Sequence, residues 1–272
     1  MAGNVSEIRI HTCSGTQKRK DDPLAATGTD TVYYAIGDVH GVADRLKLLH
    51  GQILSDHQAN HPGQAAAIIH LGDYLDRGED SKGVVDLIMA LEAEAENQPL
   101  LSVKSLMGNH EEMMLAGLDG DAAYLEVWLK NGGRETLDSY RLGDQDYDEI
   151  MLDMPRDHLD WLKSLPDILV YEEDRLIFVH AGIDPVSFPD DTAQVHLWTR
   201  SSRFFNPSSW LKNSALDGYT VVHGHTPDKK GEDVQADGCR RINVDTGAVF
   251  GGPLTAVKLV SGQEPSFLSI PS

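Results

Sequence analysis

The sequence predicts an α/β fold in which two β-sheets form a sandwich flanked by helices. Between residues 31 and 118, short β-branched and apolar runs alternate with segments whose leucines recur at helical spacing. This alternation predicts a mainly parallel sheet with right-handed crossovers. After Pro166 the chain is rich in short strand-like runs, which predict a second sheet packed on the first.

The elements follow from the pattern of apolar and turn-forming residues. The first three strands are expected at 32–36, 66–71 and 100–107, and the helices that follow them at 42–55, 81–96 and 111–118. The stretch 119–164 is expected to be helical, with helices at 124–130, 135–141 and 156–164. Strands of the second sheet are expected at 168–171, 176–180, 220–223, 241–244, 254–260 and 267–270.

One catalytic domain at residues 31–272 accounts for the chain after a polar extension at residues 1–30. No linker divides the 272 residues, and a chain of this length buries enough surface to need no disulfide. Residues 5–11 fit either an edge strand or part of a flexible extension. Cys13 and Cys239 show no pairing or metal-ligand spacing, so both are expected to be reduced thiols.

The chain is strongly acidic, with 23 Lys+Arg against 43 Asp+Glu and a formal net charge of −20. This charge argues against nucleic acid or an anionic membrane as a partner. It is compatible with an anionic substrate, because several of the acids can be ligands of multivalent cations. No secretion signal and no run of ~20 apolar residues is present, which predicts a cytoplasmic protein.

Three polar clusters follow the first three expected strands. They are Gly37-Asp38-Val39-His40-Gly41, Gly72-Asp73-Tyr74-Leu75-Asp76-Arg77-Gly78 and Gly108-Asn109-His110-Glu111. Ligands of open α/β sheets bind at the carboxyl ends of the strands, so one composite site is expected there. Asp38 and His40 can face one ion at i, i+2 spacing, and the two oxygens of Asp73 can bridge two cations. Taken singly, each cluster also fits a capping aspartate, a surface ion pair or a helix start, the last of these for Glu111.

Two histidines end later apolar runs, each beside a glycine. These are His180 and His225, and His223 lies two residues before the latter, so that either of this pair could coordinate and the other support it. A pair of divalent cations roughly 3.5–4 Å apart would suit the combined donor set of Asp38, His40, Asp73, Asn109, His180 and His225. Such a pair activates a water and binds a phosphoryl group, for which Arg77 and Arg200 are the candidate cationic partners. The sequence has no nucleophile elbow, phosphate loop or dinucleotide fingerprint.

The sequence resembles PPP-type serine/threonine phosphatases in the order of five motifs, which are the three clusters followed by His180-Ala181-Gly182 and Gly224-His225. A further segment, Asn131-Gly132-Gly133, resembles the bacterial and phage branch of that family. The resemblance spans residues 31–252 and implies the calcineurin-like metallophosphoesterase fold. It implies that Asp38 and His40 hold one metal, that Asp73 bridges, and that Asn109, His180 and His225 hold the second. It also implies that Arg77, Asn109, His110 and Arg200 contact phosphate, with His110 as the general acid, oriented by Asp76.

The resemblance implies a phosphomonoesterase that dephosphorylates phosphoserine and phosphothreonine in proteins or peptides by direct attack of a hydroxide bridging two metals. Manganese is the expected metal, and iron, zinc or magnesium also suit the ligands. No regulatory subunit is implied, because residues 245–250 replace the tyrosine-bearing loop of the eukaryotic members. One alternative with the same fold is a hydrolase of diadenosine polyphosphates or related nucleotides. The other is a noncatalytic phosphoprotein-binding pseudophosphatase, which predicts a lost ligand, whereas none is missing.

Overall fold

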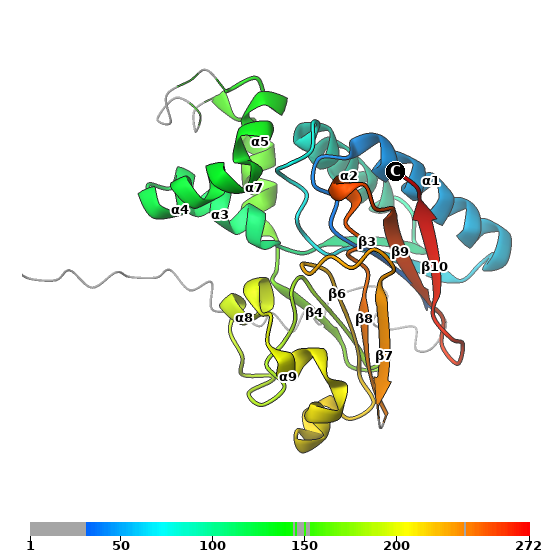
Figure 1. The fold of residues 1–272 in the computed structure, drawn as a ribbon. Coiled ribbons are helices and arrows are strands. Elements are labelled where there is room, and N and C mark those ends of the chain that lie inside the picture. Colours follow the sequence, from blue (N-terminus) through cyan, green and yellow to red (C-terminus); the bar gives the residue numbers. More distant parts are fainter. Residues whose placement is uncertain (1–30, 144, 146–149, 151–152, 237) are drawn as a thin grey trace, which may run out of the picture.

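The computed structural model describes residues 31–143, 145, 150, 153–236 and 238–272, which build two β-sheets flanked by helices (Figure 1). The predicted two-sheet α/β architecture is therefore confirmed. The extension expected at residues 1–30, including the strand considered at 5–11 and the thiol of Cys13, lies outside the described residues. Within the described part of the chain, no helix has the length and apolar character needed to cross a membrane.

The first sheet has the strand order β10-β9-β1-β2-β3. Its strands are β1 (Thr31–Ile36), β2 (Ala65–His70), β3 (Leu101–Ser105), β9 (Leu254–Leu259) and β10 (Ser266–Ile270). β1, β2 and β3 are parallel, with Thr31 opposite Ala65 and Ala66 opposite Leu101. β9 and β10 are antiparallel additions beside β1. The sheet is thus mixed rather than mainly parallel, and the last two strands of the chain join it instead of the second sheet.

The second sheet has the order β4-β5-β6-β8-β7. Its strands are β4 (Ile168–Tyr171), β5 (Leu176–Val179), β6 (Thr220–His223), β7 (Glu232–Ala236) and β8 (Cys239–Asn243). β5, β6 and β8 are parallel, and β4 and β7 form antiparallel edges. β7 was not expected, because its sequence is largely polar and short, as is common for an edge strand.

Helices connect and cover the sheets. α1 (Ala43–Asn60) follows β1 and α2 (Ser81–Ala95) follows β2, and both pack on the first sheet. A helical lobe lies beside the end of β3 (Figure 1) and consists of α3 (Asn109–Leu118), α4 (Ala122–Trp128), the π-turn η1 (Leu129–Gly133), α5 (Arg134–Ser139) and α7 (Arg156–Ser164). The short helices α8 (Ala193–Trp198) and α9 (Ser202–Phe205) and the turns η2 (Pro207–Lys212), η3 (Ser214–Leu216) and η4 (Ala248–Phe250) complete the fold.

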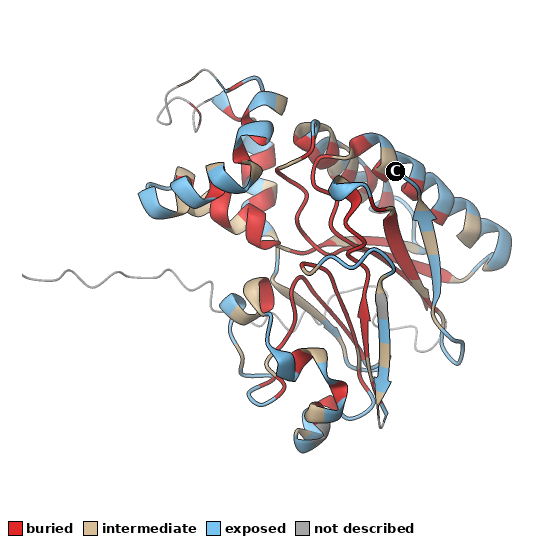
Figure 2. Cartoon of the chain, in the orientation of Figure 1, coloured by how far each residue is buried: buried red, intermediate tan, exposed pale blue. Residues whose placement is uncertain are grey.

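The two sheets meet in an apolar layer that buries the central strands (Figure 2). Tyr33 and Ala35 of β1 face Phe178 and Val222 in this layer. The alternate residues Val32, Tyr34 and Ile36 contact the helices on the other face. β1 is therefore buried on both sides, which explains its continuous apolar sequence. The loops after β1, β2, β3, β5, β6 and β8 meet at one edge of the sandwich, where the polar clusters lie.

Candidate active site

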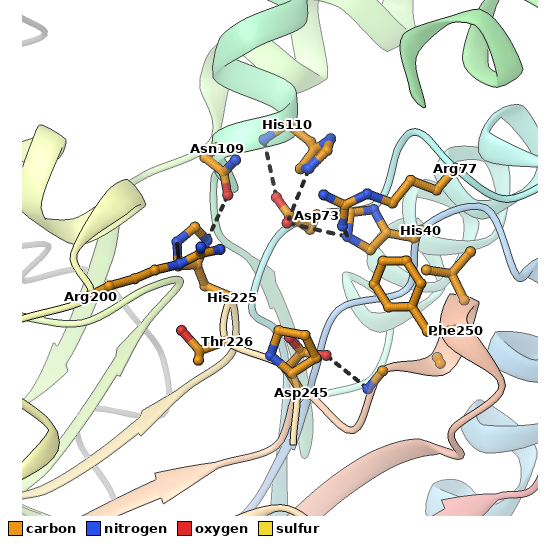
Figure 3. A pocket seen from close by; sticks show the side chains of 14 residues that line it. His40, Asp73, Arg77, Asn109, His110, Arg200, His225, Thr226, Asp245 and Phe250 are labelled. Atoms are coloured by element: carbon orange, nitrogen blue, oxygen red, sulfur yellow. Dashed lines mark hydrogen bonds and ion pairs between the residues drawn. The ribbon is translucent and has the colours of Figure 1, made fainter. Parts of the chain in front are cut away.

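A pocket of about 310 Å³ opens at the carboxyl ends of the strands (Figure 3). Seven of the ten residues predicted for the site line it: His40, Asp73, Arg77, Asn109, His110, Arg200 and His225. The other three, Asp38, Asp76 and His180, are buried behind this lining. The structure thus brings all ten together from loops that are far apart in sequence. His225, for example, donates from its backbone N–H to the carboxylate of Asp38, 187 residues earlier.

Asp73 lies at the centre of the site. Its Oδ2 is 3.4 Å from His40 Nε2, and its Oδ1 is 3.3 Å from His180 Nε2. Two clusters of potential metal ligands share this residue. One consists of His40, Asp73 and His110, and the other of Asp73, His180 and His225. One carboxylate therefore faces two separate groups of donors, which is the arrangement that a bridging ligand requires.

Two of the histidines are held in the tautomer that binds metals. His40 Nδ1 lies 2.7 Å from the carbonyl of Leu75, and His180 Nδ1 lies 2.9 Å from that of Leu71. A ring that donates through Nδ1 leaves the Nε2 lone pair for a metal. Burial lowers the pKa of His40 to about 3 and also lowers the pKa of His180, so both rings are neutral.

Asn109 stands at the start of α3, where its side-chain oxygen meets two histidines. Asn109 Oδ1 is 2.9 Å from His180 Nε2 and 2.8 Å from His225 Nδ1. Arg200 donates from Nε to His225 Nε2 at 3.2 Å, which places its guanidinium at the rim of the pocket. Asn109, His180 and His225 thus converge on one side of Asp73.

Three buried carboxylates, those of Asp38, Asp73 and Asp245, lie close enough in the site to affect one another's pKa and would attract cations. Burial, followed by the charges of Asp245 and Asp73, raises the pKa of Asp38 well above its usual range. Burial also raises the pKa of Asp245 to about 6. Divalent cations would neutralise this charge, and the mixed carboxylate, amide and imidazole donors suit them. The residues present therefore fit a two-metal centre.

Asp245 was not predicted, although the sequence contains a signal for it. It follows the apolar end of β8, as the predicted residues follow β1, β2 and β3, and it lines the pocket. Its Oδ1 accepts a hydrogen bond from Gly247 N at 3.0 Å, which ties the carboxylate to the loop that follows.

The expected contact between Asp76 and His110 is present, with 2.6 Å between Asp76 Oδ2 and His110 Nδ1. Asp76 is itself held on its other oxygen by Trp128 Nε1 at 2.9 Å and by Thr136 Oγ1 at 2.6 Å. Burial lowers the pKa of His110, but the charges of Asp73 and Asp76 outweigh it, so that the pKa is raised. Trp128 and Thr136 were not predicted.

Residues 131–133 pack on the loop that carries Arg77. Arg77 N donates to Gly132 O at 3.2 Å, and Gly132 has a φ of 109°. A Cβ at Gly132 would lie 2.5 Å from Arg77 N, so only glycine fits there. The segment therefore supports Arg77. This support does not depend on the class of phosphate compound that the site would bind.

Glu111 does more than begin α3. Its buried carboxylate accepts hydrogen bonds from the backbone N–H groups of Asp73 at 2.8 Å, Tyr74 at 2.9 Å and Gly108 at 2.9 Å. It thereby joins the loops after β2 and β3. Burial, with the charge of Asp73, raises its pKa to about 8.

His223 lies outside both candidate ligand clusters. Its Nδ1 is 2.9 Å from Gly224 O, and its Nε2 accepts a hydrogen bond from Arg241 Nη1 at 3.0 Å. Its absence from both clusters indicates a supporting role behind His225 rather than coordination.

Backbone strain concentrates in this site. Seven non-glycine residues of the described chain have a positive φ, and five of them belong to the site: His40, Asp73, Asp76, Arg77 and His225. A residue in the left-handed region costs on the order of 1 kcal/mol or more and persists where the surroundings enforce it. The clustering indicates that the loops are shaped for the site.

This combination of a two-sheet sandwich and a shared carboxylate defines a metal-dependent phosphoester hydrolase. The model of the family described as calcineurin-like phosphoesterase matches residues 32–252, and the chain belongs to this family. Among its relatives, the bis(5'-nucleosyl)-tetraphosphatase PrpE [asymmetrical] of Halalkalibacterium halodurans is 28% identical over 251 residues, which cover 87% of this chain and 92% of the relative. The protein of the same name from Geobacillus thermodenitrificans is also 28% identical, over 87% and 93% of the two chains.

Solved structures share the fold. A candidate diadenosine tetraphosphatase superposes with a TM-score of 0.54 at 22% identity, over 90% of this chain and 97% of its own. The cold-active protein-tyrosine phosphatase of a psychrophilic Shewanella superposes with a TM-score of 0.60 at 19% identity, over 91% and 84%. Because hydrolases with different substrates share this fold, the fold alone does not choose the substrate.

Proposed function

We propose that this chain hydrolyses dinucleoside tetraphosphates at a two-metal centre. The observation that carries the proposal is the name shared by relatives that align over nearly nine-tenths of the chain, bis(5'-nucleosyl)-tetraphosphatase. It reverses the preference for phosphoprotein substrates that the sequence suggested. That preference depended in part on residues 131–133, whose packing against Arg77 would serve any phosphate substrate.

Each donor has a proposed place in the centre. Asp38 and His40 would hold one cation, Asp73 would be shared, and the second cation would take the remaining three donors, Asn109, His180 and His225. When bound, the two cations supply an activated water and neutralise phosphate charge. Manganese remains the proposed metal. These donors also accept iron, zinc or magnesium.

The other site residues act on the phosphate chain directly. Arg77 and Arg200 lie on opposite sides of the pocket (Figure 3), so that their guanidinium groups can bind different oxygens of an extended polyphosphate. His110 donates through Nδ1 to the Asp76 carboxylate, which leaves Nε2 for the leaving oxygen. The bond broken is a phosphoanhydride, water supplies the new oxygen, and the leaving phosphate takes the proton.

A comparison of substrates tests this function. The chain is stripped of metal with a chelator, manganese is restored, and kcat/KM is measured with diadenosine tetraphosphate, a phosphoserine peptide and a phosphotyrosine peptide. We expect the dinucleotide to be the best substrate, and chromatography of its products distinguishes ATP plus AMP from two ADP. Faster turnover of either peptide would contradict the proposal. No turnover of any substrate would instead favour the phosphoprotein-binding pseudophosphatase.

A further inference from the structure

The loop after β8 presents an aromatic ring to the pocket. Phe250 is 57% exposed and lines the pocket together with His40 and Arg77. Among the large apolar side chains that are exposed in the described part of the chain, only Phe250 lines this pocket. Figure 3 shows its ring on the same side as His40 and Arg77, across the pocket from Arg200.

The backbone holds Phe250 in a fixed position. Gly247, in the left-handed region with a φ of 69°, turns the chain into η4, and Phe250 N donates back to Gly247 O at 2.9 Å. Arg45 of α1 donates to Ala248 O at 2.6 Å and to Gly252 O at 2.9 Å. These bonds fix the turn on both sides of the ring, so the exposed ring is presented by a rigid support.

The ring also lies beside a group that is proposed to bind phosphate. The Arg77 guanidinium carbon is 5.4 Å from the centre of the Phe250 ring. With 57% of its surface exposed, Phe250 retains free ring surface for a second planar group. A nucleotide carries a planar base one ribose away from its phosphate, and bases stack on aromatic side chains with little dependence on base identity.

We propose that Phe250 is a stacking platform for a nucleobase of the substrate, beside the phosphate bound by Arg77. This inference rests on the proposed function, because it assigns the site of one nucleoside of the dinucleotide. A base in this position selects nucleotides over base-free phosphates and tolerates any of the common bases.

Equilibrium binding tests the platform without turnover. Calorimetry on the manganese-loaded protein compares AMP with ribose 5-phosphate, which carries the same phosphate without a base, and chromatography verifies that both ligands stay intact. We expect the wild type to bind AMP about tenfold more tightly than ribose 5-phosphate. Phe250→Leu should reduce this ratio to about two or less, and Phe250→Trp should restore it. Phe267→Leu is the matched control, because Phe267 is 46% exposed on β10 and does not line the pocket.

The ratio of the affinities for AMP and ribose 5-phosphate distinguishes two roles of Phe250, namely stacking on a base and support of Arg77. If Phe250→Leu weakens both ligands equally, the ring only holds the arginine and the platform is overturned. Equal affinities in the wild type, or a ratio that Phe250→Leu leaves intact, overturn it as well. A protein that prefers AMP through Phe250 but hydrolyses phosphopeptides fastest would retain the platform and reject the proposed function.

Discussion

His110 and Asp76 pair inside the pocket wall, where the carboxylate is fully buried. A general acid of this kind matters most when the leaving group is a strong base. The proposed role therefore has a signature in the dependence of the rate on the leaving group.

His110→Gln should lower kcat by about 10²–10⁴-fold with phenyl phosphate and by less with p-nitrophenyl phosphate. The two esters are similar in shape, but nitrophenol is the stronger acid and leaves with less need of a proton. Initial rates with both esters measure the difference. His61→Gln, at the carboxyl end of α1, is the control and should match the wild type. Equal losses with the two esters would exclude His110 as the acid.

Much of the site could be predicted at the level of residues because the donors follow strands and recur at short spacings. Asp38 with His40 is one such pair, and the strand-end histidines His180 and His225 are another signal. Trp128 could not be predicted, because its bond to Asp76 joins residues 52 apart, and an indole in an apolar helix looks like an ordinary core residue.

At the level of elements, α4 of the helical lobe supports the site from behind. Trp128 is fully buried at the end of this helix and donates its indole N–H to Asp76 Oδ1 at 2.9 Å. A hydrogen bond to a charged group contributes on the order of 1.5–3 kcal/mol. The lobe therefore positions the carboxylate that in turn orients His110.

Trp128→Phe removes this donor and replaces the indole with a smaller aromatic ring. We expect kcat for the best substrate to fall about tenfold with little change in KM, since Trp128 is buried and does not line the pocket. The matched control is Trp161→Phe, because Trp161 also donates to a carboxylate, Glu92 Oε2 at 2.7 Å, but away from the pocket. If both variants lose kcat equally, a general loss of packing explains the effect instead.

Helix α8 carries a buried histidine whose protonation stabilises the fold. His196 Nδ1 is 2.6 Å from Asp167 Oδ2, and its Nε2 is 3.0 Å from Asp191 Oδ1. Burial lowers the pKa of His196, but these two carboxylates outweigh burial and raise it to about 9. The stabilisation is complete below the unfolded pKa of about 6.5 and is lost as the pH rises through 9.

Urea unfolding at pH 6 and pH 9 should therefore show a loss of stability at the higher pH. We expect the wild type to lose about 3 kcal/mol more than His196→Gln, in which this titration is absent. The comparison cancels the contributions of other groups. An identical pH dependence in the two proteins would contradict the assignment of a charged His196 at neutral pH.

The sequence pattern predicts the position of most strands but not how they pair. Strands such as β4 and β6 lie where their apolar runs predicted, because local propensity and burial agree there. The sheet to which β9 and β10 belong could not be predicted, since β9 pairs with β1 across more than two hundred residues and its sequence does not encode a partner. α8 is too short to show helical periodicity.

On the scale of the whole molecule, the site is a junction between the two sheets. Asp38, Asp73 and Asn109 follow strands of the first sheet, whereas His180 and His225 follow strands of the second. The net charge of −20 suggested that several of the acids could be ligands of cations. The structure adds that part of this negative charge is buried at the junction, where bound cations would both create the catalytic centre and connect the sheets.

The stoichiometry of bound metal tests this account most directly. Protein stripped with a chelator is titrated with manganese, and the bound metal is counted per chain by calorimetry and elemental analysis. We predict two ions for the wild type and fewer than one for Asp73→Asn, because both cations would lose their shared carboxylate. Asp56→Asn is the control and should keep two, since Asp56 pairs with Lys258 outside the pocket. One ion in the wild type, or two retained by Asp73→Asn, would contradict a centre built on Asp73.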